Sequence, residues 1–144
     1  MSIGKITKDF FQFLENLKPE DWNKKINDKW TIKDVVAHLV AWERECAICL
    51  PAAWGKKENP WFIKTDNYDE FNERAIQMYK DYSPEELLSE WKKWQDILEK
   101  EAKKIGENSL RSAQFGLTFD WFFDEGENNH YLEHFNEIKK VFID

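Results

Sequence analysis

The sequence is poor in the residues that build disulfide-rich, turn-rich and membrane-spanning proteins. Its 144 residues include only two cysteines, five glycines and four prolines. Two cysteines are too few for a fold that depends on disulfide bonds, so we expect a reduced, cytoplasmic setting. Few glycines and prolines disfavour a β-protein with many tight turns. No window holds the roughly 20 apolar residues of a membrane span, and residues 1–10 lack the apolar run of a signal peptide.

Basic residues are also scarce relative to acidic ones. Lysine and arginine total 21 against 28 aspartates and glutamates, which gives a net charge of −7. Nucleic acids and anionic membranes both recruit basic patches, so neither is an expected partner. Aromatic residues, by contrast, reach 16% and include eight tryptophans. This content excludes a disordered chain, and the length predicts a single domain over residues 1–144.

Apolar residues recur every three or four positions, which is the period of amphipathic helices. The stripes predict helices over residues 6–17, 31–50, 68–82, 84–105 and 128–142, and the third has Phe71, Ala75, Met78 and Tyr82 on its apolar face. Thr31, Ser83 and either Asn128 or Asn129 are typical helix caps, and Pro51 is expected to end the second helix. Residues 110–123 alternate weakly and predict either a packed loop or a short strand. Burying four long stripes together favours an all-α fold, a four-helix bundle with short extra helices.

The three histidines of the chain are spaced like a metal site. His130 and His134 are four residues apart and share one helix face. His38 lies on the apolar stripe of the second helix. Three imidazoles with one open position are typical of catalytic zinc sites. The alternative is that each is an ordinary core histidine with a hydrogen-bond partner. The pattern alone leaves both open, although three buried imidazoles without partners would cost several kcal/mol.

Carboxylates near the histidines are candidates for a general base. Glu137 follows His134 by three residues and therefore lies closest to the histidine row. Glu133 and Glu43 rank behind it. Each is equally compatible with a solvated carboxylate on a helix face.

Aromatic residues beside the histidines are candidates for the wall of a pocket. Trp42 lies one turn past His38, and Tyr131 follows His130 directly. The cysteines form a C-x-x-C at Cys46 and Cys49. Cys46 lies eight residues past His38, about 12 Å along a helix, so we interpret the pair as core thiols rather than ligands.

Two segments resemble the signatures of the DinB-like metalloprotein superfamily. Residues 30–43, WTIKDVVAHLVAWE, are similar to its pattern W-[ST]-x-x-[DE]-x-x-x-H-[LIV]-x-x-[WY]-[ED]. Residues 130–138, HYLEHFNEI, resemble its closing H-Y-x-E-H-x-x-x-I, and residues 68–74 resemble the F-N-[ED] segment of the ClbS/DfsB branch. The resemblance implies an up-down-down-up four-helix bundle. It also implies that His38, His130 and His134 bind one divalent ion, often zinc or nickel.

The function that the resemblance implies is a metal-dependent enzyme acting on a small molecule. Members of the superfamily include thiol-dependent transferases, a maleylpyruvate isomerase and small-molecule resistance proteins. We therefore expect a hydrolase or thiol transferase that acts in stress or toxin resistance. The alternatives are a non-catalytic protein that sequesters a small molecule or metal, and an interaction module with a vestigial metal.

The aromatic-rich loop after the second helix, with Trp54, Trp61 and Phe62, has several open interpretations. It could cover a pocket, plug the core or form a dimer surface. Relatives often dimerise, so a homodimer is compatible with the sequence.

Overall fold

The computed structural model describes residues 4–56, 67–110, 116–124, 126–127 and 129–143. Regular structure in these ranges is helical, apart from one isolated bridge between Lys25 and Thr31. The α-helices are α1 (Lys5–Glu15), α2 (Ile32–Lys56), α4 (Tyr68–Met78), α5 (Pro84–Ile105), α6 (Glu107–Leu110), α7 (Gly116–Phe122) and α8 (His130–Lys140). A 3₁₀ helix, η1 (Pro19–Asn23), joins α1 to the segment before α2. The expectation of an all-α chain is confirmed for these residues.

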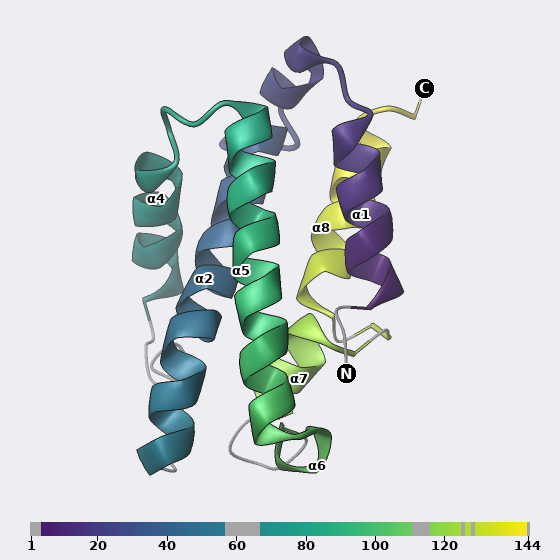
Figure 1. Cartoon of the computed structure of the whole chain (residues 1–144). Helices are drawn as coiled ribbons and strands as arrows, with labels where there is room; N and C mark the ends of the chain where they lie inside the picture. Colours follow the sequence, from purple (N-terminus) through teal and green to yellow (C-terminus); the bar gives the residue numbers. More distant parts are fainter. Residues whose placement is uncertain (1–3, 57–66, 111–115, 125, 128, 144) are drawn as a thin grey trace.

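The long helices run side by side (Figure 1). Followed in the direction of the chain in Figure 1, α1 and α8 run upward, whereas α2 and α5 run downward. α2 is the central element, because it packs against α5, α4, α8 and η1. The short helices α6 and α7 close the lower end, between α5 and α8.

The sequence of α2 explains its central place. Residues 35–43 are all buried, and seven of these nine residues are aliphatic or tryptophan. A helix that is apolar on every side gains most when other helices surround it. Its first turn is closed by a reciprocal cap: the Asp34 amide donates to Thr31 Oγ1 at 3.1 Å, and the Thr31 amide donates to Asp34 Oδ2 at 3.0 Å.

The prediction that Pro51 ends the second helix is wrong. α2 continues to Lys56 with Pro51 inside it. A proline lacks its own N–H, so it removes one helical hydrogen bond but leaves those of the following residues intact. Pro51 is exposed and lies in the last two turns, so the helix continues past it with only the bond to the Ala47 carbonyl missing.

Residues 116–122 form a helix, so the loop or strand expected between 110 and 123 is also a wrong prediction. Phe119, Phe122 and Phe123 are buried. Their spacing of three and four is that of a helix face. The alternation that suggested a strand was too short to separate the two periods; Phe115, its first member, lies outside the described residues.

At the end of α4, the buried side chain comes one residue later in the chain than the helical stripe predicts. Met78, expected on the buried stripe, is 47% exposed, whereas Tyr79 is 2% exposed. α4 ends at Met78, and the turn that follows points the ring of Tyr79 into the core, edge-on to Tyr82 at 5.0 Å. Ala75 is buried as predicted.

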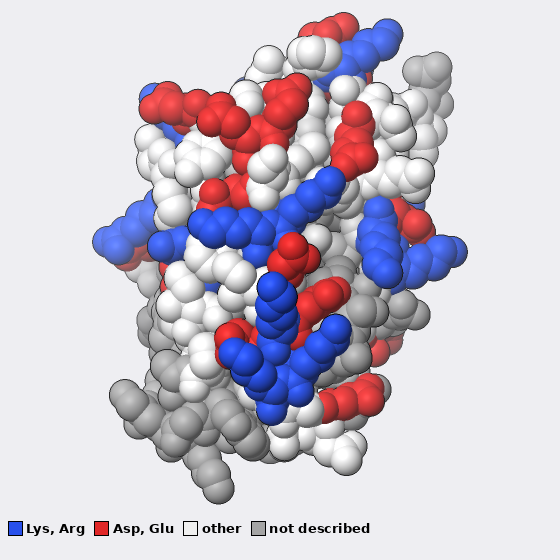
Figure 2. Space-filling model, in the orientation of Figure 1, with Lys and Arg blue, Asp and Glu red and all other residues white. Residues whose placement is uncertain are grey.

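Charged side chains of opposite sign are interspersed on the face shown in Figure 2. Three ion pairs join Lys92 to Glu15, Lys93 to Glu90, and Lys104 to Glu101. Exposed pairs of this kind each contribute little to stability. The charge on this side of α5 is therefore largely balanced locally.

The start of α5 gives a first testable prediction. Ser83 accepts a hydrogen bond from the Glu86 amide at 3.1 Å, and Glu86 Oε1 accepts one from the Ser83 amide at 3.1 Å. Replacing Ser83 with alanine removes the first bond, so we expect the free energy of unfolding in urea to fall by about 1 kcal/mol. Ser89→Ala, at an exposed site within the same helix, is the control and is expected to leave stability nearly unchanged. Equal effects of the two changes would contradict the capping role.

Candidate metal centre

The start of α8 is held by its cap, and this positions His130 and His134. Asn129 is 3% exposed; its side-chain oxygen accepts from the Tyr131 amide at 2.9 Å, and its amide donates to the Asp124 carbonyl at 2.7 Å. α8 buries the row that contains Tyr131, Phe135 and Ile138. His130 and His134 lie on the adjacent row, and both contact His38 of α2.

The three imidazoles meet in one cluster. One ring nitrogen from each of His38, His130 and His134 lies within 4.8 Å of the other two. The ring centroids are 5.5 Å apart for His38 and His130, 5.2 Å for His38 and His134, and 5.6 Å for His130 and His134. Nitrogens bound to one zinc ion at about 2.0–2.1 Å lie roughly 3–4 Å apart. Shifts on the order of 1 Å would thus bring all three to bonding distance.

The hydrogen bonds of these rings suit metal binding. His38 Nδ1 is 2.6 Å from Asn72 Oδ1, which leaves Nε2 for another partner. His134 Nδ1 lies 3.3 Å from Glu137 Oε1, but this contact lacks hydrogen-bond geometry. His130 Nδ1 and His134 Nδ1 are both buried and have no hydrogen-bond partner among the described residues. A buried polar nitrogen without a partner is costly, and three converging imidazoles could hold a divalent transition ion.

Burial keeps the three rings neutral. Desolvation, with a smaller contribution from the neighbouring His134, lowers the pKa of His38 to about 4 against the opposing effect of the contact with Asn72. Desolvation also lowers the pKa of His130 well below its ordinary value, assisted by the other two histidines. The pKa of His134 is lowered by burial, against the opposing effect of Glu137 and Glu133. Metals bind the neutral imidazole, so the unliganded cluster is already in the required protonation state at pH 7.

The histidines line an open cavity of about 310 Å³. Its other described lining residues are mainly aromatic: Trp30, Trp42, Tyr68, Asn72, Trp121 and Glu133. Trp121 stacks on His130, with centroids 4.9 Å apart and planes 27° apart. No lysine or arginine occurs among these lining residues. The cavity therefore suits a small, largely apolar molecule with a group that binds a metal.

The sequence-derived candidates lie in different places. Trp42 lines the cavity beside His38. Tyr131 points into the core, where its hydroxyl donates to Glu43 Oε1 at 2.7 Å and is fully buried. Glu137 contacts His134 from outside the described lining, and Glu133 is the carboxylate that lines the cavity.

Neither cysteine is among the described lining residues. Cys46 is buried and Cys49 is half-buried on α2. Their place agrees with the interpretation as core thiols. Trp54 lies near the end of α2 with a side chain outside the described set, and Trp61 and Phe62 lie outside the described residues.

Sequence reasoning assigned no role to Asn72 or Trp121, although both line the cavity. Asn72 was visible only as part of the F-N-[ED] segment. Trp121 belongs to the stretch that was expected to be a loop or a strand. The helical spacing of its neighbours Phe119 and Phe122 was the signal that could have placed it beside α8.

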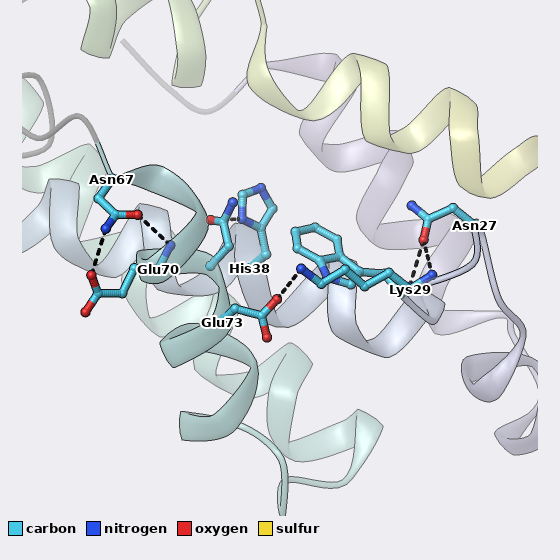
Figure 3. A network of polar contacts seen from close by, with 8 residues as sticks. Asn27, Lys29, His38, Asn67, Glu70 and Glu73 are labelled. Carbon is cyan, nitrogen blue, oxygen red and sulfur yellow. Dashed lines mark hydrogen bonds and ion pairs between the residues drawn. The ribbon is translucent and has the colours of Figure 1, made fainter.

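α4 is tied to the segment before α2 close to His38 (Figure 3). Lys29 Nζ lies 2.6 Å from Glu73 Oε1, and Asn27 Oδ1 accepts the Lys29 amide at 2.8 Å. At its start, α4 is capped by Asn67, whose side-chain oxygen accepts from the Glu70 amide at 3.1 Å. His38 lies between these two sets of contacts in Figure 3. The helix that carries Asn72 is therefore capped at its start and joined to the segment before α2 by one ion pair.

Together, the fold and the cluster define an all-helical protein with a candidate three-histidine metal site. Residues 3–108 match the family described as mycothiol maleylpyruvate isomerase N-terminal domain. The chain belongs to this family, which is part of the DinB-like superfamily. No curated protein and no solved structure matches the chain. The matched segment contains His38 but ends before His130. The evidence that the three histidines come together is therefore their geometry in the structure.

No helix within the described ranges is long and apolar enough to cross a membrane.

Proposed function

We propose that the protein is a divalent-metal-dependent enzyme that acts on a small molecule. The observation that carries the proposal is the convergence of His38, His130 and His134 within 4.8 Å at a cavity of about 310 Å³. Three protein ligands leave a position on the ion for a substrate group, as in catalytic zinc sites. Zinc or nickel would suit three imidazole nitrogens.

Between the two reactions considered, we favour thiol transfer over hydrolysis. A divalent ion on three imidazoles supplies a Lewis acid that acidifies a bound thiol or water. The family is named for a mycothiol-dependent isomerase domain, which supports a thiol as the nucleophile. A role in stress or toxin resistance would follow if the second substrate is a reactive electrophile.

Two carboxylates would then have different roles, one as a proton acceptor and one as a residue that positions a histidine. Glu133 lines the cavity, so it is placed to accept a proton from an entering thiol or water. Glu137 lies 3.3 Å from His134 Nδ1 and would hold that ring in place, as carboxylates commonly do for metal-bound histidines. A role of Glu137 as the base itself is the alternative.

For the whole chain, we propose one domain with the DinB-like up-down-down-up bundle. The directions of α1, α2, α5 and α8 in Figure 1 support this topology. The Phe71–Asn72–Glu73 segment supports a place near the ClbS/DfsB branch. A homodimer and a cytoplasmic location remain parts of the proposal.

The second candidate function is capture of a small molecule without turnover. Its support is the aromatic wall formed by Trp30, Trp42 and Trp121. Such a wall would hold an apolar molecule by packing alone. In that case the ion would anchor the ligand and would not activate it.

Removal of the metal is expected to destabilise the protein. An ion that binds only the folded state, present at a free concentration of 100 times its Kd, raises the free energy of unfolding by about 2.7 kcal/mol. For a chain of this size we therefore expect a chelator to lower Tm by roughly 10 °C. Calorimetry of protein that elemental analysis has shown to be loaded checks this. An unchanged Tm after verified removal of the ion would contradict preferential binding to the folded state.

A cobalt-substituted protein separates the two functions. Small thiols are expected to add a sulfur-to-cobalt charge-transfer band, and a thiol with an electrophile is expected to give product with turnover. Ester hydrolysis without a thiol response would favour the hydrolase. Binding without turnover of either kind would favour capture. A purified protein that takes up no ion would overturn the proposal.

A further inference from the structure

One oxygen atom links the candidate metal ligand of α2 to the wall of the cavity. Asn72 Oδ1 lies 2.6 Å from His38 Nδ1 and accepts a hydrogen bond from Trp42 Nε1 at 2.8 Å. His38 and Trp42 are one turn apart on α2, and Asn72 is on α4. A single carbonyl oxygen with two lone pairs can accept both donors.

This contact selects the position of the proton on His38. A side-chain carbonyl oxygen carries no hydrogen, so the hydrogen in the 2.6 Å contact belongs to Nδ1. In the neutral ring the lone pair then lies on Nε2. Nε2 is the nitrogen that remains for the cluster with His130 and His134.

The neighbours of Asn72 keep its amide in this orientation. The Trp42 indole donates and cannot accept, so a flipped amide would place two donors against each other. Phe71, the residue before Asn72, packs on Trp42 with ring centroids 4.2 Å apart. Glu73, the residue after it, is paired with Lys29. The backbone of α4 is therefore held on both sides of the amide.

We propose that Asn72 is a positioning residue for the metal site: it holds His38 as the Nδ1–H tautomer and fixes the ring plane through the oxygen that it shares with Trp42. The inference rests on the proposed metal site and deepens it. An amide in this place does more than join two helices, because the same bond determines which nitrogen of His38 is available. Partners of this kind commonly change metal affinity by 10- to 100-fold.

The first test examines the metal-free protein. Nitrogen-15 NMR of the histidine rings distinguishes the two neutral tautomers. We expect His38 to be protonated at Nδ1 in the wild type and to become a mixture of tautomers in Asn72→Leu. A wild-type His38 protonated at Nε2 would overturn the proposal, whatever the protein does with metals.

The second test measures affinity for Co²⁺ and Zn²⁺ by competition with a chelating dye. Asn72→Leu is expected to weaken binding by about 10- to 100-fold, whereas Asn72→Asp, which keeps an acceptor, is expected to bind at least as tightly as the wild type. Gln77→Ala, at an exposed site on the same helix, controls for general damage to α4. Equal losses in the leucine and aspartate variants, or wild-type affinity in the leucine variant, would overturn the positioning role.

The shared oxygen is tested by removing the other donor. Trp42→Phe keeps a ring in the wall but deletes the N–H, so we expect a smaller loss of affinity than in Asn72→Leu. The double variant should bind no more weakly than Asn72→Leu, because both changes act through one oxygen. Additive losses would contradict the shared contact. If the wild type binds no ion, the proposed function fails, but the tautomer measurement still decides the role of Asn72.

Discussion

Replacing His38 with alanine is expected to abolish stoichiometric metal binding. The change leaves His130 and His134 as a two-nitrogen pair on one helix and removes the sole ligand candidate from α2 in the three-histidine cluster. Structural zinc sites with four ligands reach about 10–16 kcal/mol, or on the order of 3 kcal/mol per ligand. We therefore expect affinity to fall by at least about 100-fold, measured by elemental analysis after dialysis and by dye competition.

Cys46→Ala is the matched control for this loss. Cys46 is buried on the same helix, eight residues further on, and is not among the described lining of the cavity. Its variant should retain the ion and any turnover. A variant that loses the ion would show that a thiol takes part in binding, and the three-histidine site would be wrong. Activity that persists in metal-free His38→Ala would equally refute metal-dependent chemistry.

Glu43→Gln is expected to stabilise the protein increasingly as the pH rises. Glu43 is completely buried; Oε1 accepts from the Tyr131 hydroxyl at 2.7 Å, and Oε2 has no hydrogen-bond partner among the described residues. Desolvation raises the pKa of this carboxyl well above its ordinary value, against the opposing effects of the Tyr131 hydroxyl and the Trp91 indole, and Glu99 adds a smaller increase. The folded protein therefore keeps a proton on Glu43 at pH values where the unfolded chain has released it.

The direction of the pH effect follows from this difference. From about pH 4.5 up to the raised folded pKa, the folded state binds more protons, so the free energy of unfolding falls as the pH rises. Each unit of pKa elevation corresponds to about 1.4 kcal/mol. Glutamine has no proton to lose, so the advantage of Glu43→Gln over the wild type should grow between pH 4 and pH 8 to more than about 1.4 kcal/mol.

Urea unfolding of both proteins at several pH values measures this advantage. Glu45→Gln, two residues along α2 and paired with Arg44 at 2.8 Å, removes the same formal charge from a half-buried position. It is expected to lack a stability gain that grows with pH. A difference between Glu43→Gln and the wild type that stays constant with pH would show that Glu43 is ionised in the folded protein.

The starts of three helices were predictable because helix caps act over two to four residues. Thr31 with Asp34, Ser83 with Glu86, and Asn129 at the start of α8 all form the expected local contacts. Such bonds depend on spacing along the chain and need no knowledge of a neighbouring helix. The shared face of His130 and His134 was predictable for the same reason.

Two of the wrong predictions, those for Met78 and for residues 110–123, involve neighbours that are distant in the chain. The core buries Tyr79 and leaves Met78 exposed, and the short α7 that carries Trp121 packs against α8. Glu43 pairs with Tyr131 across 88 residues. These contacts depend on the distances between packed helices, which neither local spacing nor residue type predicts.

By itself, the sequence determined that the chain is helical, where most of its helices begin, and which three side chains could share a metal ion. These properties follow from the helical period and from local hydrogen bonding. Only the tertiary structure decided that the three imidazoles meet, that aromatic rings surround them, and that Asn72 selects the free nitrogen of His38. Those contacts join α2 to α4, α7 and α8, so they exist only after the helices have packed.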